Sequence, residues 1–446
     1  MKLVTTIFTF LLLVVTTTFA QVKPTKILIT NVEIFNGKDQ KTTKGNVLVE
    51  NNIITKISTE SNNTDRSDDT QVIDGQGKFL MPGLIDAHVH LLFESVPKMQ
   101  AMVSDFAMLN LMAAKSAEKQ LMRGFTTVRD LGGGSLSLAK AIDMGFATGP
   151  RVYSSGAFIS QTGGHGDFGL PTDVPRKIGE LSYVERNGMV AIADGADNVL
   201  MRTREQLRQG ATQIKLMAGG GVSSDYDPLD VTQYTEAEFK AAVSAAENWG
   251  TYVTVHAYTP MAIKTAINAG VKCIDHGQLA DDATAKLMAE KDIWWSLQPF
   301  LDDEEVTPFP AGSKNRIKQI EMTSGTDKAY ALAKKYNVKT AWGTDVLFDS
   351  KIASKQGTKL SKMTRWYTPF EILKMATSTN AELLRMSKKR DPYQKGKLGE
   401  ITEGAYADML LVDGNPLENI KLVDDPEKNF LLIMKDGIIY KNILKK

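Results

Sequence analysis

Short apolar runs, each only a few residues long, occupy both ends of the chain. Asn and Gly separate them, as expected for turns between antiparallel strands. The runs cover residues 26–30, 32–35, 45–50 and 53–57 near the beginning, and 407–412, 431–435 and 438–440 near the end. Because the two ends share this pattern, the sequence predicts one small sheet domain built from residues 21–79 and 395–446.

The middle of the chain, residues 80–394, follows a different pattern. Strand-like apolar runs cover residues 126–128, 151–154, 213–217 and 252–256. Segments of helical period lie between them, for example residues 236–249 and 260–268. Strands that alternate with helices indicate βα units and a parallel sheet. A segment of this length suits an eight-fold barrel of TIM type better than an open sheet.

The first 20 residues have the pattern of a secretory signal peptide. Lys2 gives a short positive region, residues 7–15 are apolar, and the small residue Ala20 ends the segment. The apolar stretch is too short to cross a bilayer comfortably, so a retained anchor is the weaker alternative. We therefore expect cleavage near Ala20, export to the periplasm or the medium, and no membrane span in the mature chain.

Composition narrows the class of protein. The 446 residues are 42% hydrophobic and 24% charged, which is typical of a globular protein with a large core. Lys and Arg number 53 against 52 for Asp and Glu, so no basic field points to nucleic acid. The single cysteine, Cys273, excludes both an intramolecular disulfide and a thiolate zinc finger. Only five histidines occur, so their positions are informative.

Four of the histidines fall at the ends of predicted strands. His88 and His90 are two residues apart after an apolar run, so both imidazoles face the same side of a strand. His256 and His276 each end a strand of one βαβ unit, where the active sites of parallel α/β folds gather. Converging imidazoles are good metal ligands. Taken singly, each of them is more often a structural residue.

Two charged residues also lie in strand-like surroundings. Asp345 follows a short strand, where an aspartate is most often a helix N-cap but can also ligate a metal and accept a proton. Lys215 lies inside an apolar strand. Such a lysine reaches solvent, forms a buried ion pair, or has a depressed pKa and takes up carbon dioxide as a carbamate. Spacing alone leaves these alternatives open.

The run from Met81 to His90, Met-Pro-Gly-Leu-Ile-Asp-Ala-His-Val-His, resembles the metal-dependent amidohydrolase superfamily in its imidazolonepropionase-like and prolidase-like branch. Further matching motifs follow in order over nearly the whole mature chain. They are residues 124–130, 163–167, 214–217, 256–258, 274–277, 343–345, 399–400 and 407–408. The resemblance implies a (β/α)8 barrel with a small β-sandwich assembled from both chain ends.

The resemblance also implies two divalent metal ions, usually zinc. Their ligands would be His88, His90 and Asp345 for the more buried ion, His256 and His276 for the other, and carboxylated Lys215 as the bridge between them. No cysteine takes part in this set. Nitrogen and oxygen ligands of this kind accept several divalent metals, so the sequence leaves the identity of the metal open.

The activity that the resemblance implies is hydrolysis of an amide bond. Activated water would attack the carbonyl, Asp345 would carry its proton to the leaving amine, and Tyr258 would donate a hydrogen bond to the developing oxyanion. His165 lies in the glycine-rich loop 162–167, where the resemblance places a histidine near the substrate carbonyl. The glycine-rich stretch 219–227 comes just after Lys215 and is expected to form a second substrate loop. It lacks the order of a phosphate-binding loop.

The substrate is expected to be a small molecule. The most specific hypothesis is a dipeptidase of Xaa-Pro or related type, and its rivals are hydrolysis of cyclic amides, lactones or N-acyl amino acids. A non-catalytic periplasmic metal- or ligand-binding protein is the alternative from another class. Asp345 argues against it, because sequestration needs no proton acceptor. Relatives often assemble, so the sequence allows a homo-oligomer and leaves the oligomeric state open.

Overall fold

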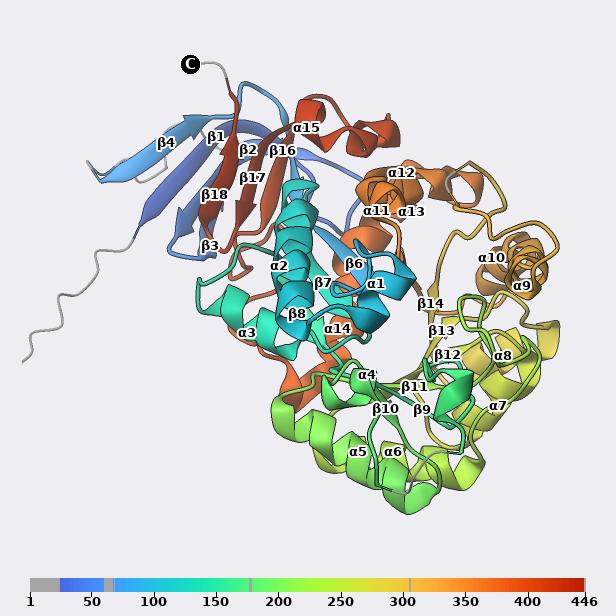
Figure 1. Cartoon of the computed structure of the whole chain (residues 1–446). Helices are drawn as coiled ribbons and strands as arrows, with labels where there is room; N and C mark the ends of the chain where they lie inside the picture. Colours follow the sequence, from blue (N-terminus) through green and yellow to red (C-terminus); the bar gives the residue numbers. More distant parts are fainter. Residues whose placement is uncertain (1–24, 60–66, 68, 176–178, 305, 445–446) are drawn as a thin grey trace, which may run out of the picture.

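The computed structural model describes residues 25–59, 67, 69–175, 179–304 and 306–444. Within these ranges the strands form three sheets, surrounded by helices (Figure 1). The predicted signal peptide, residues 1–20, lies outside the described residues and stays a prediction. None of the helices in the described ranges combines the length and the apolar character needed to cross a membrane.

One eight-stranded sheet takes strands from both ends of the chain, as the blue and red arrows at the upper left of Figure 1 show. Its amino-terminal strands are β1 (Lys26–Ile34), β2 (Thr43–Glu50), β3 (Ile53–Ser58), β4 (Thr70–Asp74) and β5 (Phe79–Pro82). Its carboxyl-terminal strands are β16 (Met409–Val412), β17 (Phe430–Lys435) and β18 (Ile438–Asn442). The two groups meet where β5 pairs antiparallel with β16 and Leu80 lies opposite Leu411.

The strands of this sheet lie close to where the apolar runs predict them. The runs at 26–30 and 32–35 join into the single strand β1, which is irregular at Asn31, a residue with a φ of 52°. The strands enclose a hydrophobic cluster of their own that includes Ile29 and Met434. Strand pairing among the described residues defines one mixed sheet here, so it does not by itself define the two layers of a sandwich.

The middle of the chain forms two parallel sheets, which confirms the predicted α/β class. Seven strands are ordered β10-β9-β11-β12-β13-β14-β15, and three are ordered β6-β7-β8. The strands are β6 (Leu84–Val89), β7 (Phe125–Asp130), β8 (Arg151–Ser154), β9 (Phe158–Ser160), β10 (Val190–Ile192), β11 (Ile214–Met217), β12 (Val253–Ala257), β13 (Cys273–His276), β14 (Trp294–Leu297) and β15 (Thr340–Trp342). The ladders of the described residues do not join the two sheets into a closed ring.

Individual hydrogen bonds cross the gaps between the two parallel sheets. The side-chain amide of Asn380 accepts from the Trp342 backbone and donates to the carbonyls of Trp342 and Ile85, so it links β15 to β6. On the other side, the backbone amide of Thr212, just before β11, donates to the carbonyl of Ser154 in β8. The two sheets are therefore held edge to edge.

Helices follow most of the parallel strands and lie outside them (Figure 1). The longer ones are α2 (Phe106–Met122), α3 (Leu136–Asp143), α5 (Ala196–Gln209), α6 (Glu236–Asn248), α7 (Pro260–Asn268), α8 (Asp282–Glu290), α9 (Lys314–Ser324) and α10 (Thr326–Lys335). The shorter ones are α1 (Lys98–Val103), α4 (Tyr183–Arg186), α11 (Ser350–Ser354), α12 (Gln356–Ser361), α13 (Pro369–Lys374), α14 (Asn380–Leu384) and α15 (Pro426–Asn429). A capping box between Thr235 and Glu238 fixes the start of α6 close to its predicted position.

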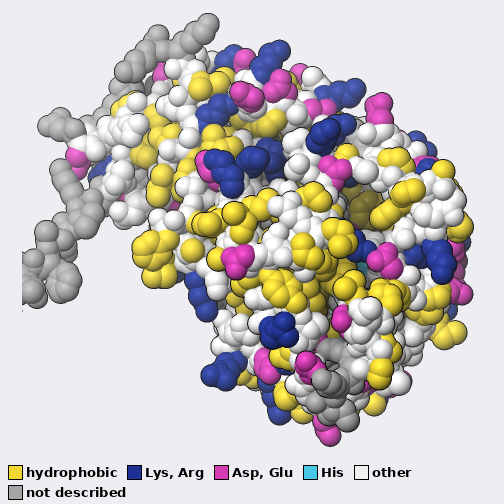
Figure 2. Space-filling view, in the orientation of Figure 1, with side chains coloured by type: hydrophobic (Ala, Val, Ile, Leu, Met, Phe, Trp, Pro, Cys, Tyr) yellow, Lys and Arg dark blue, Asp and Glu magenta, His cyan; other side chains and the backbone are white. Residues whose placement is uncertain are grey.

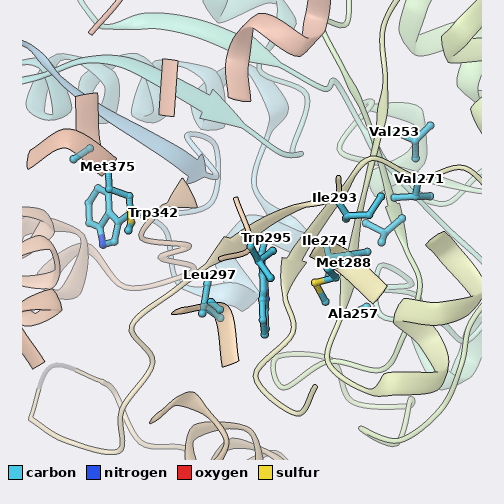
Figure 3. Close-up of a cluster of buried hydrophobic side chains, with 14 of the residues drawn as sticks. Val253, Ala257, Val271, Ile274, Met288, Ile293, Trp295, Leu297, Trp342 and Met375 are labelled. Atoms are coloured by element: carbon cyan, nitrogen blue, oxygen red, sulfur yellow. The ribbon is translucent and has the colours of Figure 1, made fainter. Parts of the chain in front are cut away.

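The parallel strands are buried on both faces. Figure 3 shows Ile274 of β13 and Ile293, next to β14, close to Met288 of α8, with Val253 of β12 further away beside Val271. Trp295 lies beside this group. Because helices cover the sheet, its strands appear in the sequence as nearly continuous apolar runs. Any polar residue within them therefore needs a partner inside the protein.

Arg151, at the start of β8, ties the parallel sheets to the mixed sheet. Its guanidinium donates to Asp408 at 3.1 Å and to Asp436 at 2.5 Å, and it lies 3.9 Å from the ring centre of Tyr406. Replacing Arg151 with Met is expected to lower the free energy of unfolding by about 3 kcal/mol, because the buried Asp408 loses its cation. Denaturant unfolding measures the change. The same replacement at the exposed Arg365 should barely move the midpoint, and equal shifts would contradict the assignment.

Candidate metal centre and active site

The eight residues that the sequence predicts for the site all line one cavity of about 470 Å³. It lies at the carboxyl ends of the parallel strands. The eight are His88 and His90 at the end of β6, His165 after β9, Lys215 in β11, His256 in β12, Tyr258 just after it, His276 at the end of β13, and Asp345 after β15.

Asp345 lies among three histidines. Its Oδ1 is 3.3 Å from Nε2 of His88 and 3.1 Å from Nε2 of His90, and its Oδ2 is 3.7 Å from Nδ1 of His276. Ligand atoms of His88, His276 and Asp345 lie within 4.8 Å of one another, close enough to share a metal ion. Burial alone would raise the pKa of Asp345, but the histidines, His88 first, hold it well below its usual range. The carboxylate is therefore ionised.

The backbone is unusual at two of these residues. His276 has a φ of 75° and Asp345 a φ of 46°, in the left-handed region that side chains with a Cβ disfavour. Gly343 lets this segment approach β6, since a Cβ there would lie 2.6 Å from the backbone nitrogen of His88. The amide of Asp345 then donates to the His88 carbonyl at 2.8 Å. Close backbone contact thus holds the carboxylate against the His88 strand.

In each of three histidines, one ring nitrogen forms a hydrogen bond to an oxygen of the protein that acts as the acceptor. These contacts are His90 Nδ1 to the Gly132 carbonyl at 3.2 Å, His256 Nε2 to the Gly220 carbonyl at 3.1 Å, and His276 Nδ1 to Gln298 Oε1 at 2.8 Å. In the neutral ring the engaged nitrogen carries the proton, so the other keeps its lone pair. Nε2 of His88 is buried and has no hydrogen-bond partner in the described structure. A divalent cation needs such lone pairs, so this donor set fits one.

Burial also keeps most of these imidazoles neutral. It lowers the pKa of His88 to about 4 and lowers the pKa values of His256 and His276 well below their usual range. For His90 burial acts the same way, but contacts with Asp345 outweigh it and raise the pKa. Metals bind the neutral ring, so three of the four histidines need no deprotonation before binding.

Lys215 faces a buried carboxylate that sequence reasoning missed. Its Nζ donates to Asp275 at 2.6 Å, and Asp275 also accepts from Arg129 at 2.8 Å and from Thr254 at 2.7 Å. Burial lowers the pKa of Lys215, although Asp275 opposes this effect. Burial would raise the pKa of Asp275, but Lys215 and Arg129 hold it well below its usual range. Of the alternatives for this lysine, the structure contains the buried ion pair.

Asp86 is a second missed residue, and it joins two parts of the site. Its Oδ1 accepts from the backbone amides of His88 at 3.0 Å and Thr344 at 3.1 Å. Its Oδ2 accepts from the Thr344 hydroxyl at 2.6 Å and from Gln356 at 2.8 Å. Asp86 therefore fixes the end of β6 relative to the segment that carries Asp345.

The two glycine-rich loops meet beside His256. The His165 ring stacks on His256 with 4.1 Å between ring centres, and its Nδ1 lies 2.7 Å from Oγ of Ser224. A Cβ on Gly221 would lie 1.9 Å from the His165 ring, so this position needs glycine. Asp227, in the same loop, accepts from the Gly221 amide at 2.8 Å. Both loops thus contribute to one wall of the cavity.

Tyr258 completes this side of the cavity. Its ring centre lies 4.9 Å from that of His256 and 5.3 Å from that of His276. Burial raises the pKa of the phenol well above its usual range, so the hydroxyl stays protonated and can donate a hydrogen bond.

Imidazoles and a carboxylate meet at the carboxyl ends of the parallel strands, where enzymes of parallel α/β folds carry their active sites. The arrangement is therefore that of an enzyme with a candidate metal centre. The sequence matches the Amidohydrolase family over residues 79–443, and the chain belongs to this family. It is a hydrolase of the amidohydrolase superfamily, as its motifs predict.

Several known proteins are similar over most of the chain. Ochratoxinase of Aspergillus niger is 33% identical over 378 residues, which are 81% of this chain and 75% of that protein. The structure of a prolidase with N-methylphosphonate-L-proline is 32% identical, with a TM-score of 0.82 over 94% of this chain and 100% of that one. A Xaa-Pro dipeptidase with methionine in its active site is 29% identical, with a TM-score of 0.79 over the same shares.

Proposed function

We propose that this protein is a metal-dependent hydrolase of amide bonds in small substrates, and that it cleaves dipeptides of Xaa-Pro or related type. The observation that carries the proposal is the group of buried histidines around the ionised Asp345, all of which line one cavity. The similarity to a prolidase and to a Xaa-Pro dipeptidase supports the substrate class.

The proposed ligands divide into two groups. His88, His90 and Asp345 would hold one divalent cation, and His256 and His276 would hold a second; zinc, which prefers such donors, suits both positions. Cations bound there would supply Lewis acidity toward the carbonyl and toward water. Lys215 would have to leave its ion pair with Asp275 as a neutral amine, a form that the burial lowering its pKa makes more accessible. That amine can bond to the carbon of carbon dioxide and release a proton, which gives the proposed bridging carbamate.

Three side chains would act on the substrate. Asp345 is ionised and central, so it can accept a proton and pass it to the leaving amine. The protonated hydroxyl of Tyr258 can donate to the oxygen on which negative charge develops. His165 stacks on His256 and lines the same cavity, a position that suits contact with the substrate carbonyl.

Hydrolysis of an N-acyl amino acid is the second candidate. The cavity lining is rich in phenylalanine, which favours a substrate with a large apolar group, and the similarity to Ochratoxinase extends over 81% of the chain. Cyclic amides and lactones remain weaker alternatives. A non-catalytic binding protein would make no use of an ionised Asp345 beside the ligands.

We also infer the remaining architecture. Only residues 155–157 separate β8 from β9, so these two form one interrupted strand. With it, strands β6, β7 and β11 to β15 complete an eight-fold barrel, flanked by a β-sandwich from residues 21–79 and 395–446. Cleavage near Ala20 followed by export, and a homo-oligomer, complete the proposal. Amino-terminal sequencing of the exported protein and light scattering test these two points.

Removal of metal tests the proposed centre. Dialysis against a chelator is expected to lower amide hydrolysis by at least about 100-fold, because the carbonyl and water lose their Lewis acid. Adding back zinc or another divalent metal should restore activity. The measurements are metal content per chain and turnover of Xaa-Pro dipeptides, N-acyl amino acids and lactones. Protein without metal that keeps full activity would contradict the proposal.

A further inference from the structure

We propose that the preferred substrates carry a bulky apolar group, aromatic by preference, on each side of the scissile amide bond. This inference rests on the proposed amide hydrolase function and specifies its substrate class. Two apolar walls that flank the metal centre support it. They belong to separate hydrophobic clusters of the protein.

The first wall lies beside His90 and Asp345. It consists of Phe93, Phe158, Phe168, Met217, Leu347 and Phe348. The Phe93 ring centre lies 5.6 Å from that of Phe348, and the Phe348 amide donates to the Phe93 carbonyl at 2.9 Å. Phe93 comes three residues after His90 and Phe348 three after Asp345, so the same two segments carry the proposed ligands and this wall.

The second wall lies beside His256 and His276. It consists of Val222, Tyr258, Phe300, Phe309 and Met322. The Phe300 ring is nearly parallel to the imidazole of His276, with 6.2 Å between the ring centres. Because one wall adjoins each group of proposed ligands, an amide bond held between the groups has an apolar surface on both sides.

Besides the proposed site residues, the charged side chains of the lining are Lys98, Asp349 and the buried Lys359. Lys98 donates to the Ser223 carbonyl at 2.9 Å and to Asp225 at 2.8 Å, so its ammonium already has partners. Asp349 accepts from the backbone amides of Lys351 and Ile352. No arginine lines the cavity in the part of the chain that the structure describes. Recognition of the groups beside the scissile bond therefore depends mainly on apolar contact.

The cavity also has room for two such groups. Its volume of about 470 Å³ lies within the range of drug-sized ligand sites. Figure 2 shows hydrophobic side chains gathered around the hollow that opens on this face. Small substrates would leave these walls in contact with water. Each bulky apolar group should therefore raise kcat/KM about ten-fold or more, the typical effect of burying a large apolar side chain.

A matched substrate series on the metal-loaded full chain tests the inference. The four members are N-acetylglycine, N-benzoylglycine, N-acetylphenylalanine and N-benzoylphenylalanine, with Ala-Pro and Phe-Pro as a dipeptide pair. We expect kcat/KM to rise about ten-fold with each aromatic group, so that N-benzoylphenylalanine exceeds N-acetylglycine by about 100-fold. Phe-Pro should likewise exceed Ala-Pro.

Two variants test which wall contacts which aromatic group of the substrate. Phe348→Ala alters the first wall and Phe309→Ala the second, and neither residue belongs to the proposed ligands. Each variant should abolish the gain from one aromatic group and keep the gain from the other. Phe146→Ala is the matched control, because Phe146 is 80% exposed and lies outside the cavity lining. Thermal melting of all three variants checks that they fold.

The outcomes separate this inference from the proposed function. Hydrolysis of N-acetylglycine or Ala-Pro at least as fast as of the aromatic members overturns the substrate class and leaves the amide hydrolase intact. Equal losses for every substrate in both wall variants overturn the assignment of the walls. A metal-loaded protein that hydrolyses none of the six overturns the proposed function and this inference with it.

Discussion

Replacing Asp345 with asparagine is expected to lower kcat for amide hydrolysis by about 10³-fold. A proton-transfer group contributes roughly 10²–10⁴-fold, and asparagine keeps the shape of aspartate but cannot accept the proton. The contacts of Asp345 with Nε2 of His88 and His90 identify it as the ionised group at the centre of the site. Steady-state kinetics and metal content of the same samples measure the effect. A D345N variant that keeps full activity would exclude the proposed proton transfer.

Asp349→Asn is the matched control for this prediction. Asp349 lines the same cavity four residues further along and accepts from the amides at the start of α11. Asparagine caps a helix about as well as aspartate, so the fold should be preserved. We expect kcat to stay within about twofold of the parent value, because this residue has no proposed part in proton transfer. A loss as large as that of D345N would instead indicate a general effect of charge in the cavity.

Replacing Asp275 with asparagine is expected to have the largest effect on stability, a loss of about 5 kcal/mol. Breaking a buried ion pair typically lowers the free energy of unfolding by about 3–5 kcal/mol, and Asp275 serves both Lys215 and Arg129. Without the carboxylate, Arg129 and the uncarboxylated Lys215 of the metal-free protein lose the anion that they share. Denaturant unfolding at neutral pH measures the loss.

Asp413→Asn provides the comparison for D275N. Asp413 also pairs with a lysine, Lys78, at 2.5 Å, but its side chain is 51% exposed. Exposed pairs contribute about 1 kcal/mol or less, so the unfolding midpoint should move little. Similar losses in both variants would show that Asp275 does not act as a buried counter-ion.

The pH dependence of the Asp275 contribution has a definite sign. Its pKa is well below the usual range in the folded protein, so the folded state favours the ionised form. The stabilisation is therefore fully present above the pKa of an unfolded aspartate, about 3.9, and is lost as pH falls through the lower folded value. The ionisation of Asp275 itself should therefore add no pH dependence to the difference between the parent protein and D275N from pH 5 to 8.

Much of the fold could be predicted because its signals are local. Apolar runs bounded by Asn, Gly or capping residues predict α6 and most strands to within a few residues. Pairing between distant strands has no such signal. The contacts of Asn380 with Trp342 and Ile85 join segments far apart in the chain, and nothing near Asn380 in the sequence indicates them.

The convergence of the candidate site residues could be predicted from similar local signals. His88, His256 and Asp345 end strands, so topology alone suggests that they converge. Asp275 was missed because alternation along a strand puts it on the opposite face from His276. The φ of 75° at His276 interrupts that alternation, and Asp275 contacts Lys215 inside the protein. A backbone irregularity of this kind is not visible in the sequence pattern.

The sheet shared by the two chain ends has a consequence for how the protein is made. Strand β5 leads directly into β6, yet its neighbour β16 is synthesised more than 300 residues later. While the ribosome works, one edge of β5 stays unpaired, and unpaired edges of this kind attract other strands. The strand that carries His88 thus gains its final support only when translation is nearly complete.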